Sequence, residues 1–221
     1  MTPLVRPLAI ALLVGTALLG AGAVLHPMLA GDAATQLRLI ADTTYWRPLH
    51  LLMLAGSGLV VAGVWLRVLL DRGVAPLGPL VAALATIALG LSVNALNIAF
   101  MAGSGWHMAA MFGAGDAAMA PLFDATHPIG LMAARFGNFI VALGALLLGW
   151  VEWHGRATPR WVAALAWAAA AGGLVGAILF DESSRAALGA VALLSGWQVV
   201  TALRALGGAP AHGNERAPSG V

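Results

Sequence analysis

Six long apolar stretches limit this chain to a small set of folds. Each holds roughly 20 or more residues, and a helix of that length rises ~1.5 Å per residue and crosses a ~30 Å hydrocarbon core. Hydrophobic residues make up 61% of the chain and charged residues 9%, so lipid is the expected solvent. The stretches cover about residues 8–29, 49–70, 77–101, 129–151, 161–180 and 186–206.

This pattern predicts an all-α membrane protein, a six-transmembrane-helix bundle over residues 1–206. The remaining segment, 207–221, mixes Gly, Pro, Ala and charges and is expected to be a disordered cytoplasmic tail. The start of the chain has the outline of a secretory signal peptide, with Arg6 before an apolar run. That run exceeds the ~7–15 residues of a signal core, which favours an uncleaved first helix. Cleavage would leave five crossings.

The distribution of arginine predicts the orientation. The chain has no lysine, and its positive loops should stay cytoplasmic. Both termini are then cytoplasmic, and the connections around 30–48, 102–128 and 181–185 face the exterior or periplasm. Net charge is only +2, so no nucleic-acid partner is expected. The cytoplasmic side carries Arg6, Arg67, Arg72, Arg156, Arg160, Arg204 and Arg216, the outer side carries Arg38, Arg47 and Arg185, and Arg135 lies inside the fourth stretch.

Four of the six histidines fall on the outer side of this topology. Imidazole is the commonest metal ligand and also a haem ligand, so these histidines are candidate metal ligands. Two outer acids could complete such a site or orient the imidazoles. No close-spaced zinc motif is present, so a site must assemble from separate helices, with His50 and His127 the expected closest pair. The candidate metal ligands are His26, His50, His107, His127, Asp116 and Asp124.

Two other interpretations of the outer histidines stay open. Each histidine could simply end a helix at the membrane interface. Methionines surround His107, and thioether plus imidazole suits Cu(I), although methionine is also a common filler of apolar packing.

A polar stripe in the fourth stretch supplies candidate ligand-binding residues. His127, Arg135 and Asn138 share one helix face, and Asn94 and Asn97 lie one turn apart in the third stretch. Arg135 could pair with an outer acid or an anionic ligand, or it could extend its head to the interface. The asparagines could line a polar cavity or hydrogen-bond between helices.

The outer connections and the fifth stretch give further expectations. A short amphipathic helix is expected within 31–48, lying at the interface. The segment 102–128 is too apolar for a solvated loop and is expected to fold back over the helix ends, with short helices around 106–112 and 117–123. Gly172 and Gly176 permit close helix approach, either within the chain or in a homodimer.

The passage from Gly149-Trp150 through Pro159-Arg160-Trp161, followed by a Gly-rich apolar helix, resembles uncharacterised bacterial multi-pass membrane protein families of unknown function. The resemblance implies a small helical bundle in a bacterial inner membrane and brings no known active site. The leading functional hypothesis is therefore binding of a metal, haem or small anionic ligand in an extracytoplasmic-side pocket. A metal-dependent membrane hydrolase and an accessory subunit without small-molecule chemistry are the alternatives.

Overall fold

A computed structural model describes residues 3–70, 75–155, 159–179 and 185–207 of the chain. Helices cover nearly all of these residues, and no strand occurs among them. In chain order the elements are α1 (Val5–Leu25), α2 (Ala33–Asp42), α3 (Trp46–Gly63), α4 (Leu66–Leu70), α5 (Leu77–Phe100), η1 (Met101–Gly105), α6 (Trp106–Gly113), α7 (Met119–Gly155), α8 (Arg160–Leu179) and α9 (Arg185–Leu206). The proposed tail, 207–221, lies outside the described residues except for its first position.

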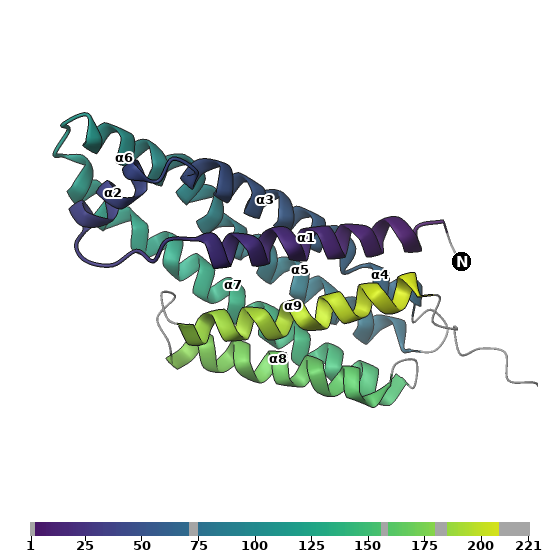
Figure 1. The fold of residues 1–221 in the computed structure, drawn as a ribbon. Helices are drawn as coiled ribbons and strands as arrows, with labels where there is room; N and C mark the ends of the chain where they lie inside the picture. The colour runs from purple at the N-terminus through teal and green to yellow at the C-terminus, as the bar shows by residue number, and fades with distance from the viewer. Residues whose placement is uncertain (1–2, 71–74, 156–158, 180–184, 208–221) are drawn as a thin grey trace, which may run out of the picture.

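Five helical stretches among the described residues are long and apolar enough to cross a membrane. They run side by side with α9, which packs against α1 and α8 (Figure 1). The apolar part of α9 that the structure describes in full, Ala192–Leu206, is shorter than the other five. The fold is thus a helical bundle suited to several membrane crossings. The five stretches are Val5–Leu25, Trp46–Leu70, Leu77–Gly113, Met119–Gly155 and Arg160–Ile178.

Two of these stretches are longer than any bilayer requires. The α5 helix continues through the π-helical turn η1 into α6, and α7 alone has 37 residues. At ~1.5 Å per residue each extends ~55 Å, against a ~30 Å hydrocarbon core. Figure 1 shows α2, α6 and the first turns of α7 at one end of the molecule, beyond α8 and α9. We call this assembly, made of α2, α6 and residues 119–127 of α7, the outer head.

The outer head corrects two expectations and confirms two others. The segment 102–128 does not form a loop over the helix ends, because all of it except residues 114–118 is helical. The helix expected around 106–112 is α6, whereas the separate short helix expected around 117–123 is only the start of the 37-residue α7. An amphipathic helix also forms within 31–48 as α2. Leu37 and Ile40 of α2 are buried in a cluster with Met108 and Phe123, so α2 rests on protein.

Glycines let the long helices pack backbone to backbone. A Cβ on Gly137 of α7 would lie 2.5 Å from the Asn94 nitrogen of α5, and a Cβ on Gly90 would lie 2.6 Å from the Val141 nitrogen. Only a residue without a side chain fits such contacts, which are typical of membrane helices. On α8, a Cβ on Gly173 would lie 2.9 Å from Ala142 of α7. Part of this glycine-rich helix is therefore used inside the monomer.

The cytoplasmic end predicted from the arginines contains a buried ion pair. The Arg67 guanidinium on α4 lies 2.5 Å from a Glu152 carboxylate oxygen on α7, and their side chains are 2% and 1% exposed. The fourth stretch was expected to end near residue 151, whereas α7 continues to Gly155 and carries Glu152 into the packed bundle.

Candidate functional site

The packing of α1 against α3 brings two of the outer histidines together. The helices are antiparallel, with a Cβ on Gly15 falling 2.7 Å from the Gly56 oxygen and one on Gly22 falling 2.2 Å from Met53. The same register, carried one turn further, sets His26 beside His50. Their ring centroids are 5.0 Å apart and the rings meet edge to face, at 73°.

The ring of Trp46 contacts both imidazoles. Its ring centroid lies 4.8 Å from that of His26 and 4.6 Å from that of His50. The indole is fully buried, and its Nε1 donates a hydrogen bond to the Met101 carbonyl at 3.2 Å. Met101 opens the π-helical turn η1, and such turns are frequent at functional sites. The indole therefore fixes the imidazole pair to α5 and the outer head.

A backbone contact orients the ring of His50. Its Nδ1 lies 2.8 Å from the Trp46 carbonyl oxygen one turn earlier, and the side chain is 2% exposed. With the proton on Nδ1, that nitrogen donates to the carbonyl and Nε2 keeps its lone pair. This is how proteins commonly prepare a histidine as a metal ligand.

The imidazole of His26 is held neutral. Burial, which is the largest cause, and the neighbouring His50 together lower its pKa to about 4, with a smaller effect of the same sign from His127. A hydrogen bond at the Pro27 backbone partly opposes these effects. Near neutral pH His26 therefore offers an unprotonated ring nitrogen beside His50.

A histidine that follows a tryptophan by four residues also occurs at the other end of the bundle. Among the described residues, no second histidine contacts its ring. His154 follows Trp150 by four positions, its Nδ1 lies 2.9 Å from the Trp150 carbonyl, and the two rings are 4.8 Å apart. His154 is exposed, however, and its described ring contact is with the tryptophan alone. The site at Trp46 and His50 therefore differs from the one at Trp150 and His154 because a second histidine, His26, contacts it from another helix.

The remaining candidate ligands occupy separate positions. His127 stacks on Phe123, with centroids 4.5 Å apart, and lies nearly parallel to Phe100 at 6.4 Å. The ring contact thus joins His50 to His26, whereas the sequence argument favoured His127 as its partner. The α1–α3 register decides this, and it depends on side-chain packing that the sequence does not display. His107 is exposed on α6.

The outer acids do not assemble with the histidines. Asp116 accepts a hydrogen bond from the Ala118 nitrogen at 3.0 Å, just before α7 begins, and Asp124 is exposed on α7. Within the described ranges, no group of three or more His, Asp or Glu residues is arranged to hold a metal ion. Metal binding by the full predicted set is therefore unsupported.

The asparagines join α5 to α7. Asn94 Nδ2 donates to Asn138 Oδ1 at 3.0 Å and approaches the Ala134 carbonyl at 3.4 Å. These bonds support the interpretation of Asn94 and Asn138 as links between helices. Asn97 lies against the backbone of α7, where a Cβ on Gly130 would fall 2.6 Å from its Oδ1. Arg135 is half-buried on the same helix, and its part in ligand binding stays a prediction.

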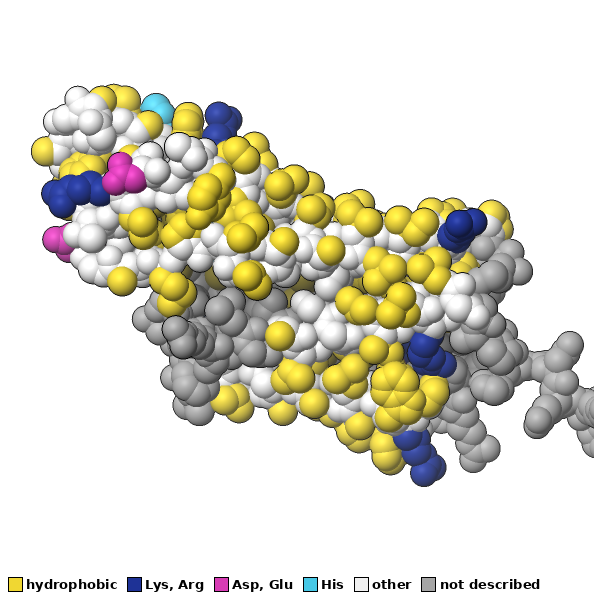
Figure 2. Space-filling view, viewed as in Figure 1, with side chains coloured by type: hydrophobic (Ala, Val, Ile, Leu, Met, Phe, Trp, Pro, Cys, Tyr) yellow, Lys and Arg dark blue, Asp and Glu magenta, His cyan; other side chains and the backbone are white. Residues whose placement is uncertain are grey.

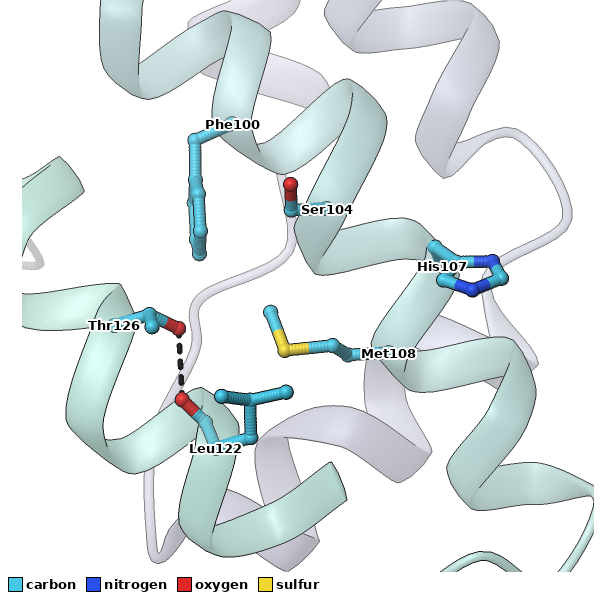
Figure 3. A pocket seen from close by; sticks show the side chains of 6 residues that line it. All are labelled: Phe100, Ser104, His107, Met108, Leu122 and Thr126. Atoms are coloured by element: carbon cyan, nitrogen blue, oxygen red, sulfur yellow. Dashed lines mark hydrogen bonds between the residues drawn. The ribbon is translucent and has the colours of Figure 1, made fainter. Parts of the chain in front are cut away.

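A groove opens between α7 and the connection from α5 to α6, close to His127. Its volume is about 300 Å³. Figure 3 shows the Met108 side chain reaching into it, the Phe100 ring along one wall and His107 at its edge. The lining residues are Phe100, Ser104, His107, Met108, Leu122 and Thr126.

No known protein family, curated protein or solved structure matches this chain. The class is therefore defined by the structure itself: the described residues are almost entirely helical, with five helices suited to membrane crossing and a histidine pair at one end.

Proposed function

We propose that this chain is a six-span protein of a bacterial inner membrane, with both termini in the cytoplasm, that binds one Cu(I) ion between His26 and His50. The observation that carries the proposal is the 5.0 Å contact between these two imidazoles. They come from different helices, in a part of the bundle packed with aromatic side chains. Both are prepared as neutral ligands, His26 by its lowered pKa and His50 by its bond to the Trp46 carbonyl.

The ligand set favours a soft monovalent ion. Zinc sites use three or four protein ligands, and the described residues offer no third His, Asp or Glu beside the pair. A divalent charge would also need carboxylates to offset its cost in apolar surroundings. Imidazole ligands, with thioethers such as that of Met101 in the neighbouring cluster, suit Cu(I).

The geometry is compatible with one small ion and less so with haem. Two nitrogens bound to the same ion at ~2 Å each lie at most ~4 Å apart, which rings in edge-to-face contact reach by small rotations. A haem held between axial imidazoles would have to separate these two rings and displace Trp46. The hydrolase alternative gains no support, because no carboxylate gathers beside the pair among the described residues to act as a base.

A Cu(I) titration tests the proposal. Detergent-purified protein, kept under reducing conditions, competes with a chromophoric Cu(I) chelator. We expect one Cu(I) per wild-type chain and a loss of more than ~100-fold in affinity for both His26→Ala and His50→Ala, because losing even a residue that only orients a ligand costs ~10–100-fold. His154→Ala is the matched control, because it removes the same Trp-linked imidazole from the other end, and it should bind as the wild type does. Absence of tight Cu(I) binding, or equal affinity in all three variants, would contradict the proposal.

Reporter fusions test the six-span orientation. Seven of the eleven arginines favour a cytoplasmic location for both termini, which requires an even number of crossings. Fusions after Gly73, Thr158 and Val221 should report a cytoplasmic location, and a fusion at Ala114 should report an external one. An external signal at Val221 would mean that α9 does not cross, and a cytoplasmic signal at Ala114 would put the histidine pair on the wrong side. Gly73, Thr158 and Val221 lie outside the described residues.

A homodimer through Gly172 and Gly176 belongs to the proposal as well. Gly172 is half-buried and Gly176 is buried within the monomer, so a partner helix would approach α8 on the side of Gly172. The Cu(I) site does not depend on it, because His26 and His50 come from one chain.

A further inference from the structure

We propose that the groove between α7 and the α5–α6 connection binds the acyl chain of a phospholipid from the outer leaflet. It is separate from the His26–His50 pair, and the inference depends only on the outward orientation of this end. Its residues come from three consecutive elements, α5, η1 and α6, on one wall and from α7 on the other.

The groove has the chemistry of an amphiphile site. Phe100, Met108 and Leu122 give it apolar walls, and the Leu122 side chain is 47% exposed. The Thr126 hydroxyl donates to the Leu122 carbonyl at 2.8 Å, as Figure 3 shows. Because this hydroxyl already has an acceptor for its proton, it does not need one from a ligand. Polar groups capable of meeting a headgroup, on Ser104 and His107, remain at the outer side.

The groove also lies at the right depth. From Leu77 to Phe100, α5 has 24 residues and rises ~36 Å, slightly more than a ~30 Å hydrocarbon core. Phe100 is therefore near the outer edge of the acyl region, and the groove continues from Phe100 into the interface, where Ser104, His107 and Met108 lie. A lipid chain can reach the Phe100 wall while its headgroup stays in the interface.

Lipid-facing surface leads directly into the groove. On α5, Leu96 precedes Phe100 by four residues and is 61% exposed; on α7, Ile129 follows Thr126 by three and is 70% exposed. Residues at these spacings share one helix face. Exposed apolar side chains also cover much of the bundle surface in Figure 2. The groove thus continues the surface that acyl chains already cover, which makes a membrane lipid the fitting occupant.

The test compares two threonines, one that lines the groove and one that lies outside it. Thr126 lines the groove, while Thr86 lies on α5 away from it; both are half-buried and both donate to the carbonyl four residues earlier at 2.8 Å. Thr126→Trp places an indole in the groove, and Thr86→Trp adds the same bulk elsewhere. The protein is reconstituted with phosphatidylglycerol and phosphatidylethanolamine, extracted in mild detergent and weighed by native mass spectrometry.

We expect the wild type and Thr86→Trp to retain one phospholipid, and Thr126→Trp to retain about tenfold less. In wild-type protein, a phosphatidylglycerol analogue with a photoreactive acyl chain should label Phe100, Met108 or Leu122, and excess unlabelled lipid should suppress this labelling. This second measurement does not depend on the folding of a variant. Retention that is equal in both tryptophan variants, or labelling of the groove that excess lipid does not reduce, would overturn the proposal.

Discussion

Replacing Glu152 by leucine is expected to destabilise the bundle by about 3–5 kcal/mol. The substitution leaves the Arg67 guanidinium, 2% exposed, without the carboxylate that lies 2.5 Å away. Removing one partner of a buried ion pair is costly, because the remaining charge loses that partner in a low-dielectric interior. The free energy of unfolding, measured by denaturing-detergent titration, should record this loss.

Two further variants make the measurement specific. Asp124→Leu removes an exposed acid from the same helix and should be nearly neutral. The double variant Arg67→Met/Glu152→Leu removes both charges and should recover most of the lost stability, because paired charges can be replaced by apolar residues at little cost. If Glu152→Leu behaves like Asp124→Leu, the ion pair does not stabilise the bundle.

Adding one methyl group at Gly137 should also cost about 1–3 kcal/mol. A Cβ there meets the Asn94 backbone nitrogen at 2.5 Å and the Gly90 carbonyl oxygen at 2.7 Å, and backbone atoms cannot move aside as a flexible side chain can. Gly137→Ala must therefore push α5 and α7 apart, which would also strain the Asn94–Asn138 hydrogen bond.

Gly58→Ala is the matched control for this change. A Cβ at Gly58, on the exposed face of α3, has nothing within 4 Å. Because alanine is the better helix former, Gly58→Ala should stabilise the bundle by about 0.5–1 kcal/mol. Thermal unfolding of both variants in detergent compares them directly, and effects of the same sign would contradict the close packing of α5 on α7.

The apolar pattern predicted where membrane helices lie but not where the longest of them end. The stretch 49–70 corresponds closely to α3 and α4, which span Trp46–Gly63 and Leu66–Leu70. At the outer end, the fourth stretch was expected to begin near residue 129, yet α7 begins at Met119 and passes through Pro128. In segments rich in Gly, Ala and Met, the residue pattern alone does not indicate how far a helix extends. Here burial against α2 stabilises the helical extensions.

The candidate site was predictable in its residue types but not in its pairing. Which histidines meet depends on the register of α1 and α3, set by contacts such as Gly15 on Gly56. Glycines at 15 and 22 and at 56 and 63 were a visible signal for that contact. Trp46, which was not among the candidate site residues expected from the sequence, is fully buried in contact with both imidazoles, and its indole donates to the Met101 carbonyl of η1.

X-ray absorption at the copper edge of the Cu(I)-loaded protein tests the central claim most directly. The pairing of His26 with His50 predicts a low-coordinate ion whose main ligands are nitrogens, with at most one sulfur from a neighbouring methionine. The copper and its spectrum should be lost together in the His26→Ala/His50→Ala variant. A sulfur-dominated spectrum, or a nitrogen-ligated spectrum that persists in that double variant, would show that copper binds elsewhere and would contradict the proposed site.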